Sequence, residues 1–308
     1  MRFAPDRGLN VRMLTTMFLL GLVYVLFVAL LLAAGVSMVP VLVIAALLLA
    51  AQFWFSDRIA LYSMRASIVS PEQAPELHGL VDRLCALADM PKPQVAIAQT
   101  DLPNAFATGR SPKAAVLCVT TGLLRRLDRG ELEGVIAHEL SHVAHRDVAV
   151  ITIASFLGML AGFLARMAMY AEMFGGFGGG NGRRSNQGGD NVAVAGLAIM
   201  LISGLVYLIS FLLIRALSRY RELLADRSGA LLTGRPSALA SALVKVSGEA
   251  ARIPTRDLRQ AEHLNAFFFS PVKARGFSLS SLFATHPSLE VRLRQLQELE
   301  SQLDRPNS

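Results

Sequence analysis

The residues best suited to chemistry lie near the middle of the chain. His138, Glu139 and His142 form a His-Glu-x-x-His pattern inside a segment with helical signals. Residues four apart share one face of a helix, so both imidazoles can reach one Zn²⁺ at about 2.0–2.1 Å. Glu139 then projects toward a metal-bound water, whose pKa can fall to about 7. The pattern predicts a hydrolytic zinc site with Glu139 as the base; the alternative, a chance match on a surface helix, arises on the order of one time in a hundred chains of this length.

A catalytic zinc site usually takes three protein ligands and leaves one position open. Segment 218–230, SRYRELLADRSGA, offers Glu222 and Asp226 four residues apart on one helix face. We expect Glu222 to be the third ligand, with a solvated surface carboxylate as the alternative. Asp226 is expected to accept the free N–H of a ligating imidazole and so orient the ring. His145, seven residues after His138, is expected to be structural or interfacial.

The composition indicates that lipid is part of the solvent of this chain. Of its 308 residues 53% are hydrophobic and 17% charged, and the mean hydropathy is +0.45. Residues 13–56 contain no Asp, Glu, Lys, Arg or His, and about 44 helical residues are far more than one crossing of a ~30 Å core needs. We predict two spans there, with a turn near 35–40, and two more at 148–165 and 192–214. A signal peptide is the competing interpretation, but the apolar run is too long and lacks a small-x-small site.

The predicted spans bring the candidate ligands to one side of the membrane. His142 lies about six residues before the third span and Glu222 about eight after the fourth, so at 1.5 Å per residue both lie roughly 10 Å from the same face. Cytoplasmic flanks are enriched in Arg and Lys. Arginines precede the first span and follow the second and fourth, at positions 2, 7, 12, 58, 65, 215, 219 and 221. We therefore expect the N-terminus and the site in the cytoplasm, although one excess positive charge between the third and fourth spans weakens the assignment.

Local patterns predict the elements that position the site. Residues 94–100 and 114–121 are typical of short strands, with a small-residue strand or turn at 104–109, so we expect a small sheet. Asp128 and Glu131 have capping-box spacing and begin the helix that carries the His-Glu-x-x-His pattern.

Further helices are predicted before and after these elements. Ser70, Pro71 and Gln73 indicate a capped helix start before an apolar stripe at helical spacing. That stripe consists of Leu77, Leu80, Val81, Leu84 and Leu87. After the fourth span the helical pattern stops near Gly234 and Pro236, resumes at 237–247, and returns in a last amphipathic helix from Pro287. The Gly-rich residues 175–189 are expected to be a plain linker.

Two further features carry no separate function in this interpretation. The net charge of +7 is explained by basic residues beside membrane spans, and no nucleic-acid module is recognisable, so no nucleic-acid partner is expected. Cys85 and Cys118 are the two cysteines of the chain and have no metal-type spacing. We expect both to be buried, reduced thiols in a cytosolic portion.

The motifs occur in an order that resembles the HtpX family of bacterial membrane metallopeptidases, relatives of the prenyl-protein endoproteases that cleave CAAX-type substrates. The matching segments are NAFATG at 104–109, VTTGLL at 119–124, HELSHVAHRD at 138–147, RELLAD at 221–226 and THP at 285–287. The resemblance implies a bacterial inner-membrane, zinc-dependent protease. It also implies cleavage of misfolded or damaged membrane proteins on the cytoplasmic side, in stress-linked quality control.

The resemblance also implies roles for individual residues. It makes His138, His142 and Glu222 the ligands of one zinc ion per chain, and Glu139 the base. His286 and Arg292 match a pair that lies beside the active site and stabilises the tetrahedral oxyanion. Asn104 matches an element that binds substrate main chain, where an extended peptide can add to a sheet edge.

These predictions combine into a mainly α membrane protein. It has four transmembrane helices, a cytoplasmic helical metallopeptidase unit and a small β-sheet. The predicted segments are a transmembrane hairpin at 1–56, metallopeptidase parts at 57–147 and 215–308, and the third and fourth transmembrane helices at 148–214. Expected partners are the lipid bilayer and polypeptide substrates, membrane proteins above all. Two alternatives stay open: a processing peptidase for one lipidated or signal-bearing substrate, and a non-catalytic adaptor braced by zinc.

Overall fold

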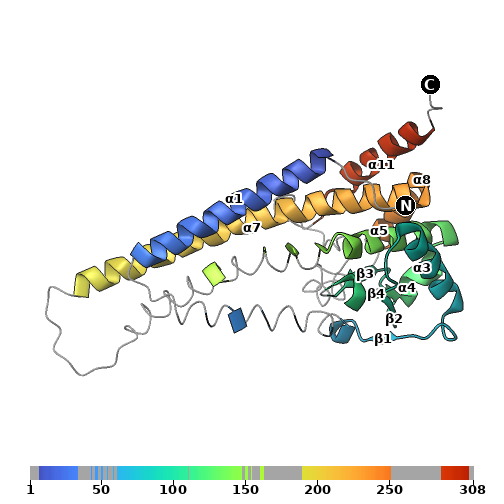
Figure 1. Cartoon of the computed structure of the whole chain (residues 1–308), viewed down its shortest axis with the longest axis horizontal. Helices are drawn as coiled ribbons and strands as arrows, with labels where there is room; N and C mark the ends of the chain where they lie inside the picture. The colour runs from blue at the N-terminus through green and yellow to red at the C-terminus, as the bar shows by residue number, and fades with distance from the viewer. Residues whose placement is uncertain are drawn as a thin grey trace. The chain divides into compact units, whose positions relative to one another are not determined.

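The computed structural model describes residues 7–33, 61–109, 111–147, 189–250 and 286–304, with isolated positions between them. The chain divides into two compact units, one formed by Met1–Met13, Phe53–Val150 and Arg215–Ser308, the other by Leu14–Gln52 and Ile151–Ile214. The described elements are mainly helical (Figure 1). In chain order they are α1 (Arg7–Ala33), β1 (Ala66–Ile68), α3 (Pro75–Ala88), β2 (Gln94–Ala98), β3 (Ala105–Thr108), η1 (Pro112–Ala114), β4 (Val116–Thr120), α4 (Thr121–Arg126), α5 (Arg129–Ala144), α7 (Gly189–Thr233), α8 (Pro236–Ala250) and α11 (Leu289–Leu303).

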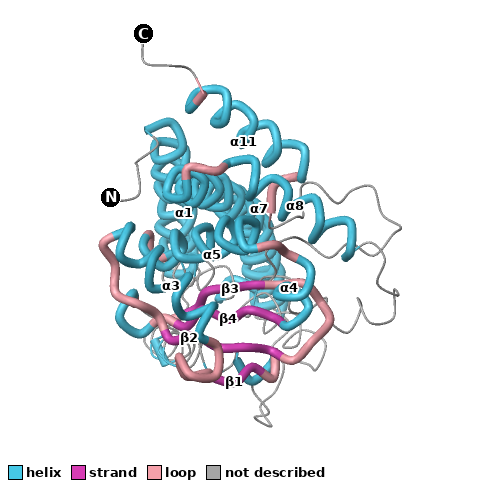
Figure 2. Tube along the Cα trace, turned by 90° about the vertical axis from the view of Figure 1, so that its right-hand side faces the viewer, coloured by secondary structure: helices cyan, strands magenta, loops and turns pink. Residues whose placement is uncertain are grey.

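The predicted small sheet is confirmed, and it has four strands in the order β1-β2-β4-β3 (Figure 2). Strands β2 and β4 are parallel, with Gln94 opposite Val116, whereas β1 and β3 join antiparallel at the two edges. The β4 side chains are all buried, which is typical of a strand covered on both faces. Strand β3 is an edge strand and contacts α5, the helix that carries the His-Glu-x-x-His pattern.

Helix α5 begins at the predicted capping box. The Asp128 side chain accepts the Glu131 main-chain N–H at 2.9 Å, and the Glu131 side chain accepts the Asp128 N–H at 3.0 Å. Glu131 also accepts from Ser241 Oγ at 2.6 Å and Lys245 Nζ at 2.7 Å, both on α8. The cap therefore fixes the start of α5 against a second helix as well as satisfying its first turn.

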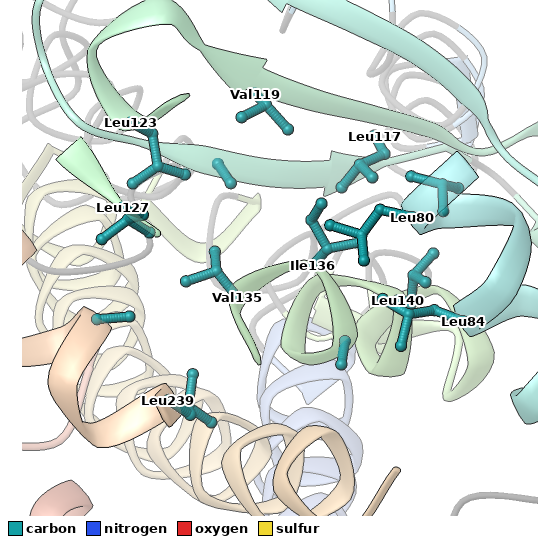
Figure 3. Close-up of a cluster of buried hydrophobic side chains, with 14 of the residues drawn as sticks. Leu80, Leu84, Leu117, Val119, Leu123, Leu127, Val135, Ile136, Leu140 and Leu239 are labelled. Carbon is teal, nitrogen blue, oxygen red and sulfur yellow. The ribbon is translucent and has the colours of Figure 1, made fainter. Parts of the chain in front are cut away.

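A hydrophobic core holds α5 between the sheet and the helices of the first unit (Figure 3). Ile136 of α5 lies beside Leu80 of α3 and Leu117 of β4, and Leu140 lies beside Leu84. Full burial of an aliphatic side chain of this size contributes about 1.5–3 kcal/mol. The core side chains occupy one side of α5, so the polar side chains of its His-Glu-x-x-His pattern lie on the other side.

One predicted helix start is wrong. Ser70 and Gln73 close a turn, in which the Ser70 N–H donates to the Gln73 side chain at 2.8 Å and the Gln73 N–H donates to the Ser70 carbonyl at 3.1 Å. Helix α3 begins only at Pro75, with Ala74 as a cap that makes no side-chain bond. Proline suits the first helical position because its missing N–H has no partner there, and it outweighs the upstream cap signal.

The C-terminal helices begin and end close to the predicted positions. Helix α7 ends at Thr233, Gly234 has a positive φ of 66°, and α8 begins at Pro236. A glycine in this left-handed conformation is a common helix stop. The last helix, α11, begins at Leu289, two residues after Pro287, so the segment that carries Arg292 is helical as expected.

Among the residues that the structure describes, two helices are long and apolar enough to cross a membrane, Arg7–Ala33 of 27 residues and Leu197–Thr233 of 37 residues. At 1.5 Å per residue even the shorter measures about 40 Å, more than a ~30 Å hydrocarbon core. Their exposed faces carry large apolar side chains, among them Leu14, Phe18 and Leu201. Such surfaces are consistent with lipid contact and not with water.

The structure describes only some of the other residues in the four predicted membrane spans. Within the second unit, Phe27 of α1 packs with Val206 of α7, and the Tyr24 hydroxyl donates to the Ala154 carbonyl at 2.9 Å. Most of the second and third predicted spans, and nearly all of the Gly-rich segment 175–189, lie outside the described residues. Four spans, and the segment bounds drawn from them, therefore stay a prediction.

Candidate metal centre

The three predicted ligands meet at one point of the first unit. The Nε2 atoms of His138 and His142 on α5 are 3.2 Å apart. Oε1 of Glu222 on α7 is 3.5 Å from His142 Nε2, and its Oε2 is 3.7 Å from His138 Nε2. Ligand atoms around a tetrahedral zinc with bonds of about 2.0–2.1 Å are about 3.3–3.5 Å apart. The three side chains therefore fit one small cation.

The predicted base lies beside this group and against the sheet edge. Glu139 is buried, and its Oε2 accepts the main-chain N–H of Ala107 on β3 at 3.0 Å. Burial raises the pKa of Glu139 to about 8. A neighbouring divalent cation acts in the opposite direction, since it favours the carboxylate form. Glu139 therefore links the candidate metal site to the main chain of an edge strand.

A glycine allows α7 to approach α5 at the first histidine. A Cβ at Gly229 would lie 2.7 Å from the main-chain N of His138 and 3.0 Å from its Cα. Gly229 is seven residues after Glu222 and three after Asp226, so all three share one face of α7. The sequence carries a signal for this position: glycine inside a helix costs about 1 kcal/mol relative to alanine and usually has a packing reason when it occurs.

Asp226 lies behind His138. Its Oδ1 is 2.9 Å from His138 Nδ1. Arg292 of α11 donates from Nε at 2.7 Å and Nη2 at 2.6 Å to the two oxygens of Asp226. Arg292 is 1% exposed, and its Nη1 lies 3.8 Å from Glu222 Oε2. The guanidinium thus neutralises a fully buried carboxylate and lies near a second one.

A similar arrangement lies behind His142, and sequence reasoning missed it. His142 Nδ1 is 2.7 Å from Oδ2 of Asp147, and Arg221 of α7 is ion-paired with Oδ1 of the same carboxylate. Burial lowers the pKa of His142, but Asp147 outweighs this effect and the pKa rises to about 9. Asp147 can reach back because Arg146, with φ of 57°, turns the chain just after α5. A left-handed arginine has no clear sequence signal, because glycine is the usual residue there.

The structure brings the remaining predicted site residues to different places. His286 Nδ1 lies 2.9 Å from Glu222 Oε2, so it contacts a candidate ligand. Asn104 is fully buried; its N–H donates to Thr120 Oγ1 and its carbonyl accepts the Thr120 N–H, both at 2.9 Å. His145 Nδ1 is 2.8 Å from the Ser141 carbonyl of its own helix. The close contacts of Asn104 and His145 are thus with the protein itself.

Comparison with known proteins decides the family. Residues 71–300 match peptidase family M48. The chain belongs to peptidase family M48. Curated relatives named Protease HtpX homolog include one from Streptomyces coelicolor, 61% identical over 303 residues that cover 98% of this chain and 96% of the relative. Another, from Moorella thermoacetica, is 54% identical and covers 98% of both chains.

The predicted HtpX resemblance is therefore confirmed, and the chain is a metallopeptidase associated with membranes. A further relative, Protease HtpX homolog 2 from Methanosarcina mazei, is 50% identical over 98% of this chain and 99% of the relative. Among solved structures, Ste24p of S. mikatae matches with a TM-score of 0.54 at 16% identity, over 94% of this chain and 67% of that one. At that identity the likeness concerns the fold alone.

Proposed function

We propose that this M48 peptidase is a zinc-dependent endopeptidase that cleaves misfolded or damaged membrane proteins at the cytoplasmic face of the bacterial inner membrane, in protein quality control and the stress response. The observation that carries the proposal is the spacing of the ligand atoms of His138, His142 and Glu222, beside a buried Glu139. Two imidazoles and one glutamate form a donor set typical of catalytic zinc.

The proposed chemistry assigns a role to each side chain. When bound, a zinc ion would polarise the scissile carbonyl and lower the pKa of a water molecule. Glu139 takes the proton of the attacking water and passes it to the leaving amine. Asp226 Oδ1, 2.9 Å from His138 Nδ1, is placed to hold the proton of that ring on Nδ1 and keep the opposite nitrogen free to bind the ion. His286 is kept as the proposed oxyanion donor, whereas Arg292 acts through Asp226.

Strand β3 is the proposed binding edge for substrate main chain. Because the Thr120 N–H donates to the Asn104 carbonyl, the main-chain groups of Asn104, Phe106 and Thr108 face β4. Those of Ala105 and Ala107 then face away from the sheet, as the bond from Ala107 to Glu139 illustrates. An extended peptide can pair with this edge, which would place its main chain beside the base. Asn104 lies at the start of this proposed element, where its burial and its two bonds to Thr120 hold the edge in place.

The proposed location rests on apolar length and arginine placement. We propose a multi-pass protein with four membrane helices, of which α1 and α7 are long and apolar enough to span. Arg2 before α1, Arg7 and Arg12 at its start, and the arginines in the C-terminal half of α7 favour a cytoplasmic N-terminus and site.

The proposal is tested with detergent-purified wild type and Glu139→Gln, compared for bound zinc and for hydrolysis of casein and of an unfolded membrane protein. We expect about one zinc per chain in both proteins and cleavage by the wild type alone. Zinc in both with no cleavage by either would contradict the endopeptidase. Cleavage of one sequence among a broad panel of peptides would instead indicate a processing peptidase, and unfolding on zinc removal without hydrolysis would indicate a structural site.

A further inference from the structure

Asp147 and Arg221 form a buried pair directly behind one candidate ligand. Asp147 Oδ2 lies 2.7 Å from His142 Nδ1, and its Oδ1 is paired with Arg221 Nη2. The two residues are 8% and 7% exposed. Both oxygens of the carboxylate are therefore engaged, one by the imidazole and one by the guanidinium, away from bulk water.

This pairing determines which nitrogen of His142 can bind a metal. A neutral imidazole carries one proton, on Nδ1 or on Nε2, and only the other nitrogen has a free lone pair. An ionised carboxylate can only accept hydrogen bonds, so Asp147 holds the proton of His142 on Nδ1. The nitrogen that faces His138 and Glu222 is Nε2. In the neutral ring it is the nitrogen left unprotonated, as a metal ligand must be.

Arg221 makes this arrangement dependent on α7. Arg221 and Glu222 are adjacent in the sequence, yet Glu222 points into the ligand cluster while Arg221 pairs with Asp147. Arg221 also donates to the His145 carbonyl at 3.4 Å, at the C-terminal end of α5. One turn of α7 thus supplies the third ligand and holds the carboxylate that orients the second.

We propose that Asp147, held by Arg221, is a positioning residue that presents His142 Nε2 to the metal ion. The inference rests on the proposed function, because it needs a metal at the His138, His142 and Glu222 cluster. It adds that Arg221 of α7, by holding Asp147, helps to determine which nitrogen of His142 on α5 carries the proton.

The variant Asp147→Asn tests the tautomer directly. Arg221 has only donors, so a carboxamide at this position turns its oxygen to the guanidinium and its NH₂ to His142 Nδ1. His142 must then accept on Nδ1 and carry its proton on Nε2, where the ion would bind. Loss of such an orienting partner lowers metal affinity by about 10- to 100-fold.

The measurement is the Zn²⁺ dissociation constant of the full-length protein in detergent, by competition with a chromophoric chelator. Asp147→Asn is expected to weaken binding by about 10- to 100-fold and to change the visible spectrum of the Co²⁺ form. Thermal melting of the metal-free proteins shows whether the fold is kept. Glu133→Gln is the matched control: Glu133 is a buried α5 carboxylate paired with Arg83 outside the cluster, and its Zn²⁺ affinity should equal that of the wild type.

The double variant Asp147→Asn/Arg221→Met removes the donors that orient the amide. The amide can then rotate its oxygen to His142, so binding should recover several-fold from the single variant and stay weaker than wild type. It leaves no unpaired buried charge, so it also serves if the single variant folds poorly. Wild-type affinity in either variant would overturn the inference alone. A wild type that binds no metal would overturn the proposed function as well.

Discussion

His286 Nδ1 lies 2.9 Å from Oε2 of Glu222, so a residue three positions before α11 contacts the candidate ligand on α7. The other oxygen of Glu222, Oε1, is 3.5 Å from His142 Nε2. The two oxygens of one carboxylate therefore have different neighbours. His286 is therefore placed to orient the Glu222 carboxylate toward the two histidines.

This contact predicts that His286→Ala lowers metal affinity as well as activity. A residue that only donates to the oxyanion would lower kcat by about 10²- to 10³-fold and leave the metal in place. We expect in addition a several-fold weaker Zn²⁺ dissociation constant, because Glu222 loses the partner that orients it. Chelator competition and steady-state kinetics on the same preparations separate the two effects. An unchanged affinity with reduced kcat would restrict His286 to the oxyanion role.

Replacement of Arg292 by methionine is expected to destabilise the fold. Asp226, which is fully buried, would keep its charge without the guanidinium that neutralises it. Removal of one partner of a buried pair costs about 3–5 kcal/mol. Arg294→Met, at an exposed position of the same helix, should change the free energy of unfolding by less than about 0.5 kcal/mol. Denaturant melts of both metal-free variants in detergent make the comparison, and equal stabilities would refute the buried-pair argument.

The close approach of α7 to α5 predicts that Gly229→Ala damages the metal centre. The added methyl would lie 2.7 Å from the main chain of His138, so α7 must move and take Glu222 with it. We expect a weaker Zn²⁺ affinity and a lower melting temperature. Gly79→Ala is the control, because Gly79 lies inside α3 and a methyl group added there would meet no atom of another element within 4 Å. That change should stabilise by about 0.4–1 kcal/mol, and a similar gain at Gly229 would show that the helices are not in close contact.

Metal binding is expected to strengthen as the pH rises. In the absence of a cation, burial raises the pKa of Glu139 to about 8, and the pKa of His142 is about 9 because Asp147 outweighs burial. At pH 6–7 both groups therefore carry a proton that a divalent cation must displace, and each displaced proton adds about tenfold in affinity per pH unit. Zn²⁺ titrations between pH 6 and 9 should show this increase. The dependence should be shallower in Glu139→Gln, and an identical slope would contradict the assignment to Glu139.

The local parts of the site could be predicted from the sequence because helix geometry is local. His138 and His142 share a face in any α-helix, and the Asp128–Glu131 box marks where that helix begins. Strands β2, β3 and β4 also follow from short-range patterns, whereas β1 was not predicted. The same kind of local signal predicted the wrong helix start at Ser70. There a cap-like residue closes a turn, and the helix begins only at Pro75.

Only some of the contacts between distant segments could be predicted from the sequence. The pairing of Glu222 with the two histidines followed from the predicted spans, and Asp226 from its spacing on the same helix. The partners of these carboxylates did not follow: Arg292 meets Asp226 across 66 residues, and Asp147 meets His142 through a left-handed arginine that has no common sequence signal. The oxyanion role of His286 stays a prediction beside its observed contact with Glu222.

By itself, the sequence determined the candidate donor set, the candidate base, the helix that carries the His-Glu-x-x-His pattern and the apolar segments, because each depends on residue type and on periodicity within one element. The tertiary structure decided which carboxylate orients which imidazole, which arginine neutralises it, and that Ala107 of an edge strand contacts Glu139. Those contacts depend on how closely α7 crosses α5, which a missing side chain at Gly229 permits, and on packing of α11 against α8. Packing between elements depends on the combined shapes of many side chains, and no spacing rule along the chain contains that information.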